Sequence, residues 1–363
     1  MDSCFLDDYL SRQHAKARLY PQPVEAMVEL TYGCNLLCVH CYNPTHLARN
    51  ELSTEKIFSI LDQMAEMGTL QICFTGGEIF SRKDSLSILD YAKKKGFQII
   101  LLTNATLITP AMADRLQEIA PRRIDISLYG ATRKTYERVT GVPGSFGKFL
   151  SGLGLLKSRG LALRLKSIIL TLNLKEVEAM RRFSKKWGIS FEYQTDVNPR
   201  VNGDRAPLAF RISPLEEARL WHRYVMTPTL KKGLTEDVSC RTDHEGPFDC
   251  HCGKSKYVIT PYGQMNLCIF NYFPKRNVLD GQVAQSWRDI VDLVKKTKPT
   301  KEHVCPVCPV YDFCSRGPGD SWAEMGDVNA CVPYHWESAT LHKALWEGDA
   351  TRRRQIVGDG TVK

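Results

Sequence analysis

Residues 26–41 read AMVELTYGCNLLCVHC, and this stretch decides how the rest of the sequence is interpreted. Its first six residues are mostly apolar and predict a short buried strand. The loop that follows places Cys34, Cys38 and Cys41 within eight residues. Three thiolates can hold three irons of a [4Fe-4S] cluster and leave the fourth iron open to an external ligand. The alternative, half of a zinc site, has no fourth cysteine nearby to complete it.

Outward from this stretch, apolar segments alternate with segments of helical periodicity as far as residue 193. We expect strands at 26–31, 70–74, 97–103, 123–128, 163–170 and 189–193. We expect helices at 54–67, 84–95, 110–119, 146–159 and 174–187. Strands joined by helical crossovers indicate a parallel sheet covered by helices, either a barrel or a doubly wound sheet.

Polar signals follow the expected strands where each one ends. The cysteine loop follows the first strand, Gly76-Gly77-Glu78 the second, Asn104 the third, and Ser127 ends the fourth. In either architecture the carboxyl ends of parallel strands meet at one edge, where binding sites form. We therefore expect these residues to surround one site.

Composition excludes several classes of protein. The hydrophobic share of 43% is ordinary for a globular chain, and no apolar run is long enough to span a membrane. Lys and Arg outnumber Asp and Glu by 49 to 40, but they are dispersed along the sequence, which argues against a nucleic-acid-binding protein. The first residues lack a secretory signal, and thirteen cysteines in tight groups favour metal ligands in a reducing compartment. A cytoplasmic location is expected.

The cysteine loop and the Gly-Gly-Glu turn together resemble the radical S-adenosylmethionine (SAM) superfamily. The resemblance implies a partial (β/α)6 TIM-type barrel, and SAM bound at the open iron through its amino and carboxylate groups. It implies that His40 lies against the adenine and that the Gly76-Gly77-Glu78 loop holds the amino group of SAM. Asn104 and Ser127 match positions that contact the ribose or the methionine carboxylate. Lys166 matches a position that is often basic.

A second group of cysteines lies toward the C-terminus. Their spacing resembles the SPASM extension of radical SAM enzymes, a small cysteine-rich α+β domain with auxiliary [4Fe-4S] clusters. The resemblance implies one complete cluster on Cys305, Cys308, Cys314 and Cys331, and a second on Cys250, Cys252 and Cys268.

The second of these clusters has no certain fourth ligand. Pro318 occupies the position where the extension carries the missing cysteine. Substrate, Cys240 or Asp249 are the alternatives for this place. Structural zinc sites are the competing interpretation of the whole group, because Cys-x2-Cys pairs are common zinc elements.

These patterns divide the chain into five expected segments. They are an N-terminal extension at 1–25, the radical SAM core at 26–195, a connecting segment at 196–239, the auxiliary-cluster domain at 240–335, and a C-terminal helix with a disordered tail at 336–363.

The resemblance also implies a substrate class. Enzymes with this extension mostly modify ribosomally made peptides by cross-linking, thioether formation or oxidation, and Asp196 and Arg200 are our candidates for substrate contact or proton transfer. Only 25 residues precede the first expected strand, so a separate leader-recognition protein is expected, together with an electron donor such as flavodoxin or ferredoxin. The alternatives are a radical SAM enzyme of haem synthesis and a non-catalytic zinc or electron-transfer protein.

Overall fold

A computed structural model describes residues 3–225, 246–248, 250–270, 274–349, 351 and 356. Its centre is one nine-stranded sheet with the strand order β6-β5-β4-β3-β2-β1-β7-β8-β9. Neighbours among the first six strands pair in parallel, as in a partial barrel. These strands are β1 (Glu25–Thr31), β2 (Gln71–Gly76), β3 (Gln98–Thr103), β4 (Arg123–Ser127), β5 (Leu163–Ile168) and β6 (Ser190–Gln194). The α/β fold expected from the sequence is confirmed.

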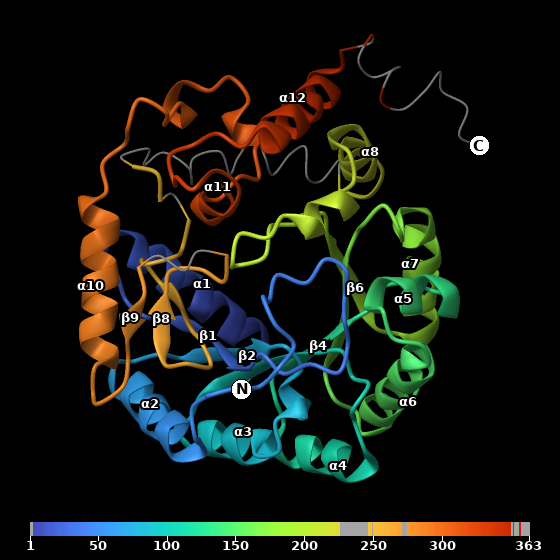
Figure 1. Ribbon diagram of the computed structural model, residues 1–363, viewed down its shortest axis with the longest axis vertical. Coiled ribbons are helices and arrows are strands. Elements are labelled where there is room, and N and C mark those ends of the chain that lie inside the picture. Colours follow the sequence, from blue (N-terminus) through green and yellow to red (C-terminus); the bar gives the residue numbers. More distant parts are fainter. Residues whose placement is uncertain are drawn as a thin grey trace. The chain divides into compact units, whose positions relative to one another are not determined.

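Helices connect the six strands and lie along the outer side of the sheet (Figure 1). Each buries one apolar stripe: in α2 the residues Ile57, Ile60, Leu61 and Met64 recur at helical spacing and are all buried. The helices are α2 (Thr54–Glu66), α3 (Ser85–Lys94), α4 (Pro110–Ile119), α5 (Arg133–Thr140), α6 (Ser145–Ser158) and α7 (Val177–Trp187), with short 3-10 turns at Ile79–Ser81 and Leu174–Glu176. Of these, α5 was not expected from the sequence.

An N-terminal helix, α1 (Ser3–Leu19), precedes the barrel. Its residues Leu10 and Ala17 form a buried cluster with Val24, against which Leu70 packs. Val24 and Leu70 immediately precede β1 and β2, so α1 packs at the amino ends of these strands. The expected N-terminal extension is therefore an ordered part of the barrel.

Three short strands extend the sheet beyond β1. They are β7 (Lys256–Ile259), β8 (Gln264–Asn266) and β9 (Arg276–Asn277), and α10 (Val283–Lys296) follows them. β7 runs parallel to β1, whereas β8 and β9 continue as antiparallel neighbours. Part of the expected auxiliary-cluster domain thus belongs to the same sheet as the barrel.

Contacts group the chain into two compact units. Unit 1 comprises residues 1–210 and 251–294, and unit 2 comprises 211–250 and 295–363. This grouping differs from the sequence-based boundaries, which stay a prediction about where domains begin and end. The expected disordered tail after residue 348 lies almost wholly outside the described residues.

Unit 2 is built around two packed helices. α8 (Pro214–Tyr224) begins with a capping box of Ser213 and Glu216 and packs against α12 (Pro333–Glu347). A salt bridge of 2.7 Å joins His342 to Glu217 between them. The unit also contains α11 (Pro318–Met325) and 3-10 turns at Cys305–Val307 and Tyr311–Phe313, whereas the 3-10 turn at Ala206–Phe210 ends unit 1. Across the described residues, each helix is too short or too polar to cross a bilayer.

Candidate functional site

The cysteine loop leaves the carboxyl end of β1 in a fixed conformation. The backbone N–H of Tyr32 donates to Oε1 of Glu51 (2.7 Å), and the backbone N–H of Gly33 donates to Oγ1 of Thr31 (2.9 Å). Thr31 also donates its hydroxyl to Glu51 (3.1 Å). Glu51 thus holds the loop at its start, a role that the sequence did not indicate.

The three thiols of the loop influence one another electrostatically. Burial and the charges of Glu78 and Cys41 raise the pKa of Cys34 to about 12. Burial and the charges of Cys41 and Cys34 raise the pKa of Cys38 well above its usual value. Positively charged iron would offset both effects, because a metal-bound thiol is deprotonated.

The spacing of these side chains bears on the zinc alternative. Within the described ranges, no three Cys, His, Asp or Glu side chains converge as the ligands of a single ion do. A cubane distributes its cysteines over separate iron atoms and does not require such convergence. The three thiolates of the loop match the ligand set of a cubane with one open iron.

The Gly-Gly-Glu loop at the end of β2 packs directly on the cysteine loop. The backbone N–H of Gly77 donates to the carbonyl oxygen of Thr31 (2.7 Å), and that of Glu78 donates to the carbonyl oxygen of Gly33 (2.9 Å). A Cβ at Gly76 would lie 2.2 Å from the Thr31 oxygen, and one at Gly77 would lie 2.3 Å from the Gly33 oxygen. Gly76 also has a φ of +130°. Only glycine permits this approach.

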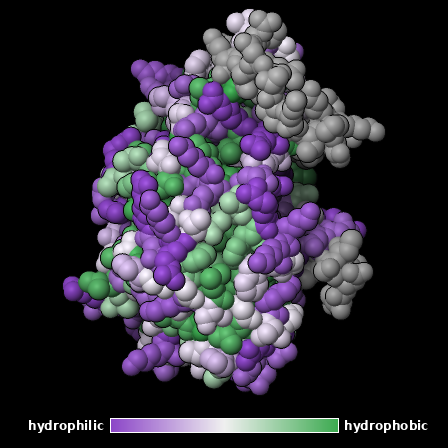
Figure 2. Space-filling model, turned by 90° about the vertical axis from the view of Figure 1, so that its right-hand side faces the viewer, coloured by the Kyte–Doolittle hydropathy of each residue, from purple (hydrophilic) through white to green (hydrophobic). Residues whose placement is uncertain are grey.

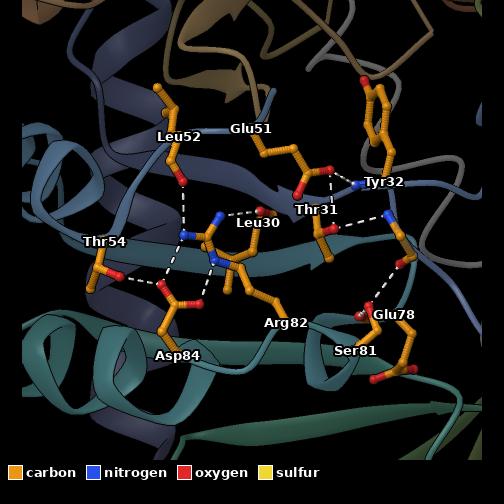
Figure 3. A network of polar contacts seen from close by, with 11 residues as sticks. Leu30, Thr31, Tyr32, Glu51, Leu52, Thr54, Glu78, Ser81, Arg82 and Asp84 are labelled. Carbon is orange, nitrogen blue, oxygen red and sulfur yellow. Dashed lines mark hydrogen bonds and ion pairs between the residues drawn. The ribbon is translucent and has the colours of Figure 1, made fainter. Parts of the chain in front are cut away.

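Arg82 holds neighbouring segments of the chain together close to this junction (Figure 3). Its guanidinium donates to the carbonyl oxygens of Leu30 (3.1 Å) and Leu52 (2.8 Å). It also forms a salt bridge of 2.7 Å with Asp84, which in turn accepts a hydrogen bond from Thr54. Arg82 therefore ties β1 to the segment before α2, and nothing in the sequence pattern distinguished it.

Glu78 is fully buried, and its carboxylate is occupied by protein donors. It accepts hydrogen bonds from the Thr103 hydroxyl (2.7 Å), the Asn104 backbone N–H (2.7 Å) and the Phe80 backbone N–H (3.2 Å). Burial raises its pKa despite these donors. The geometry makes Glu78 a residue that fixes the end of β3, whereas contact of its side chain with SAM stays a prediction.

A cavity of about 250 Å³ opens at the carboxyl ends of the strands. It is lined by nine residues that the sequence analysis selected, namely Cys34, Cys38, His40, Cys41, Gly76, Gly77, Asn104, Ser127 and Lys166. Further lining residues that the sequence analysis did not select are Tyr42, His46, Thr75, Asp125, Tyr129, Ser167, Gln194, Ile269 and Phe270. The structure thus brings the predicted cofactor residues of five strands to one place, as the barrel topology requires.

His40 forms part of the cavity wall as a neutral ring. It packs edge-on against Tyr129 with 4.8 Å between ring centroids. Burial lowers its pKa to about 4, and its Nδ1 atom is buried without a hydrogen-bond partner. An aromatic wall with an unsatisfied nitrogen fits a purine ring, which offers both a flat face and polar edge groups.

A buried carboxylate lies beneath the cavity. Burial raises the pKa of Glu29 on β1 to about 7, although Glu29 accepts hydrogen bonds from the hydroxyls of Tyr42 (2.8 Å) and Tyr32 (3.1 Å). Tyr42 lines the cavity and packs edge-on against Phe270 at 5.8 Å. No sequence pattern indicates this group, because its members meet only after folding.

Asp125 lines the cavity but is already paired. It is 4% exposed and forms salt bridges with Arg123 (2.7 Å) and Arg164 (2.6 Å). These two partners neutralise its charge, so its role is to hold β4 and β5 together. Lys166 is the only Lys or Arg among the described residues that line the cavity.

The two candidates for substrate contact lie outside the described cavity wall. Asp196 is exposed. Arg200 forms a salt bridge with Asp204, and its charge opposes the rise in the pKa of Cys41 that burial causes. Catalytic roles for Asp196 and Arg200 stay predictions.

Four C-terminal cysteines gather within unit 2. Burial and the charges of Cys305 and Cys331 raise the pKa of Cys314 to about 11, and Cys305 and Cys308 also raise that of Cys331. Nη1 of Arg316 donates to Sγ of Cys305 (3.4 Å). This set fits the complete auxiliary cluster that the resemblance implies.

The other three cysteines are divided between the units. Cys252 and Cys268 belong to unit 1, where a Cβ on Gly253 would lie 2.8 Å from the Leu267 side chain, so their segments are adjacent. Cys250 belongs to unit 2. Pro318 occupies the first turn of α11, a favoured helix position for proline. The alternative ligands Cys240 and Asp249 lie outside the described residues.

Comparisons with known proteins agree with this site. Residues 28–184 match the radical SAM superfamily. The AdoMet-dependent heme synthase of Methanosarcina barkeri is 25% identical, covering 84% of this chain and 94% of that protein. The mycofactocin maturase MftC of Mycobacterium tuberculosis is 27% identical, covering 81% of this chain and 78% of that protein. The PqqA peptide cyclase of Ruegeria pomeroyi is 32% identical over 44% of this chain and 43% of its own length.

Among solved structures, Streptococcus suis SuiB bound to the precursor peptide SuiA superposes with a TM-score of 0.67 at 17% identity, covering 91% of this chain and 80% of SuiB. At this identity the likeness concerns the fold. A parallel partial barrel with a three-cysteine loop and a glycine-rich loop at one cavity defines an enzyme with an open iron-sulfur cluster. Over its barrel, residues 28–184, the chain is similar to the radical SAM superfamily.

Proposed function

We propose that this radical SAM enzyme abstracts hydrogen from a ribosomally made peptide and so forms a cross-link, a thioether or an oxidised residue. The cluster and SAM together supply a 5′-deoxyadenosyl radical by one-electron cleavage of a C–S bond. The observation that carries the peptide assignment is the similarity to the mycofactocin maturase over 81% of this chain. The fold shared with a peptide-bound enzyme is compatible with it.

We assign the cavity residues as follows. The three loop cysteines hold the cluster, and His40 with Tyr129 faces the adenine. The backbone of Gly76 and Gly77 would hold the amino group of SAM, whereas Asn104 and Ser127 would contact its ribose or its methionine carboxylate, with Lys166 beside them in the cavity wall. Because the loops pack tightly on each other, these groups are held in place before SAM binds.

The auxiliary clusters serve electron transfer in this proposal. Cys305, Cys308, Cys314 and Cys331 hold one [4Fe-4S] cluster, and Cys250, Cys252 and Cys268 hold a second. Removal of hydrogen leaves a substrate radical, and forming a new bond from it requires loss of one more electron. A cluster is a suitable acceptor for that electron.

A haem-pathway activity is the second candidate, because the heme synthase of Methanosarcina barkeri matches over 94% of its length. A tetrapyrrole carries propionates that need cationic partners. The described cavity wall offers Lys166 alone for that purpose, and SAM itself carries a carboxylate. The cavity therefore favours the peptide.

The proposal includes partners and a compartment. A separate recognition protein presents the leader of the peptide, and a flavodoxin or ferredoxin supplies the electron. Eleven cysteines among the described residues are free thiols, which supports a reducing cytoplasm as the place of action.

The test uses the anaerobically reconstituted full chain with dithionite and SAM. We expect 5′-deoxyadenosine, and with the cognate precursor peptide a mass loss of about two hydrogens by mass spectrometry. In a parallel reaction an iron coproporphyrin replaces the peptide. Loss of propionate carboxyl groups there, with no change in any peptide, would establish the second candidate. Absence of 5′-deoxyadenosine under all conditions would refute both.

A further inference from the structure

The outer helices of the barrel differ sharply in charge. α2, α3 and α4 carry four basic and six acidic residues, a net −2. α5, α6 and α7 carry nine basic and two acidic residues, a net +7, against +9 for the whole chain. The basic residues are dispersed along the sequence, but folding collects them on one side of unit 1. We call this side, formed by α5, α6 and α7, the basic face.

The basic face meets the cysteine loop at α5. The backbone N–H of Leu37 donates to the carbonyl oxygen of Thr140 (2.9 Å), and that of Val39 donates to the carbonyl oxygen of Val139 (3.0 Å). Leu37, next to Cys38, is 57% exposed, although it is a large apolar residue. An exposed apolar side chain, Leu37, therefore lies next to a cluster ligand in the sequence and beside the basic helix α5.

Much of the charge on the basic face is not neutralised. Lys134 and Arg138 on α5 are exposed and form no salt bridge within the described part of the chain, and Arg133 reaches Glu137 only at 4.0 Å. Figure 2 views the side on which α5, α6 and α7 lie, where hydrophilic side chains border a smaller hydrophobic area. Such a surface attracts an acidic partner over a distance and adds little apolar contact.

We propose that an acidic one-electron carrier protein docks on α5 and Leu37 and reduces the cluster there. This inference rests on the proposed function, which requires one electron for each SAM cleaved. The carrier loses one electron and the cluster gains it, with no proton or group transferred. We place the docking site on this side because α5, α6 and α7 are basic whereas α2, α3 and α4 are slightly acidic. The electron path is short because the cysteine loop is hydrogen-bonded to α5. A small, charged contact suits a transient electron-transfer encounter.

The test compares two reductants of the cluster-loaded full chain. Formation of 5′-deoxyadenosine is followed with photoreduced acidic flavodoxin and, separately, with dithionite. The variants are Lys134→Glu, Arg138→Glu and their combination. Lys56→Glu on α2, also exposed and without a salt bridge among the described residues, is the matched control.

We expect the double variant to lower the flavodoxin-driven rate about tenfold at low salt, because electrostatic steering is worth at least that factor. Its dithionite-driven rate should equal that of the wild type, and the Lys56 control should match the wild type with both reductants. Rising salt should slow the flavodoxin-driven reaction of the wild type and abolish the difference between the variants.

Equal flavodoxin-driven rates in the wild type and the double variant would overturn the docking surface. An equal loss in the Lys56 control would also overturn it, since the effect would then follow net charge. If the double variant lost binding of duplex RNA while its electron transfer was unchanged, the basic face would serve nucleic acid instead. Failure of the dithionite reaction in the wild type would refute the proposed function itself.

Discussion

Gly77 is the residue at which the two loops of the site come closest. A Cβ at this position would lie 2.3 Å from the Gly33 oxygen and 2.7 Å from the Tyr32 oxygen, and both are backbone atoms that cannot turn aside. Gly77→Ala must therefore displace the cysteine loop, at a cost of about 1–3 kcal/mol. We expect the purified variant to retain less than about half of the site's iron in a quantitative iron and sulfide assay.

Gly147→Ala is the matched control for this substitution. Gly147 lies in α6, and a Cβ there meets nothing within 4 Å. Because alanine is the better helix former, this variant should gain up to about 1 kcal/mol and keep its iron. Full iron content in Gly77→Ala would show that the loop tolerates displacement.

Arg316 is the charged residue that touches a cysteine of unit 2. It donates to Sγ of Cys305 (3.4 Å) and to the Ser321 hydroxyl (2.7 Å). A positive donor at a cluster sulfur favours the reduced state. Arg316→Gln should lower the midpoint potential of this cluster by about 50 mV, close to a tenfold change for a one-electron couple. An EPR-monitored redox titration measures it.

The control for Arg316 removes an equal charge elsewhere in unit 2. Lys301 is 92% exposed and lies 3.9 Å from Glu302. Lys301→Gln should leave the potential unchanged, since solvent screens its charge. An equal shift in both variants would show that total charge, not the contact with Cys305, sets the potential.

At the scale of elements, Glu25 joins α1 to β1 and β7. Its Oε2 atom lies 3.4 Å from Nε2 of His14 on α1 and 3.1 Å from Nζ of Lys256 on β7. Burial alone would raise the pKa of Glu25, but these two partners outweigh it and lower the pKa to about 2. Since the folded pKa lies below the usual 4.5, the pair stabilises the fold above pH 4.5. That stability is lost as the pH falls toward 2.

Glu25→Gln should therefore lower the free energy of unfolding by about 2–3 kcal/mol at pH 7, as measured by urea unfolding. The difference from the wild type should shrink as the pH falls below about 4.5 and disappear near pH 2. Glu66→Gln on α2, where the carboxylate is exposed, should change little. A Glu25 difference that vanished near pH 7 would contradict the assigned ionisation.

The strands also show which parts of the fold could be predicted from the sequence. The six barrel strands are five to seven residues long and alternate with helices, and the first four end in polar signals, so the fold and most cavity positions follow from pattern. β7, β8 and β9 have only four, three and two residues, too few for a period to appear. β7 pairs with β1 although more than 200 residues separate the two strands in the sequence.

The site residues that the sequence did not predict were missed for a similar reason: their contacts form only on folding. Glu29 and Tyr42 are thirteen positions apart and pair only because the cysteine loop folds back over β1. Tyr129 carries no distinctive sequence signal, because a tyrosine after a strand is common in any fold and its contact with His40 forms only in the folded chain. The role of Glu78 was expected from resemblance to be ligand contact, whereas its carboxylate is held by donors from β3 and the following loop.

At the scale of the whole molecule, the two cysteine groups with complete ligand sets belong to different units. Cys34, Cys38 and Cys41 lie in unit 1, and Cys331 with its three partners lies in unit 2. Each group is completed by local segments of its own unit. The two clusters should therefore assemble independently, and loss of one should not remove the other.

Cys331→Ala tests this independence. It should remove about four irons per chain, the content of one cubane, while dithionite-driven cleavage of SAM continues at near the wild-type rate. Conversion of the peptide should stop, because the electron of the substrate radical has lost its acceptor. Cys73→Ala removes a buried thiol of β2 instead, so it should cost about 1 kcal/mol of stability and no iron. Loss of SAM cleavage in Cys331→Ala would mean that the units depend on each other for cluster assembly, since no residue of the SAM cavity in unit 1 is altered by this substitution.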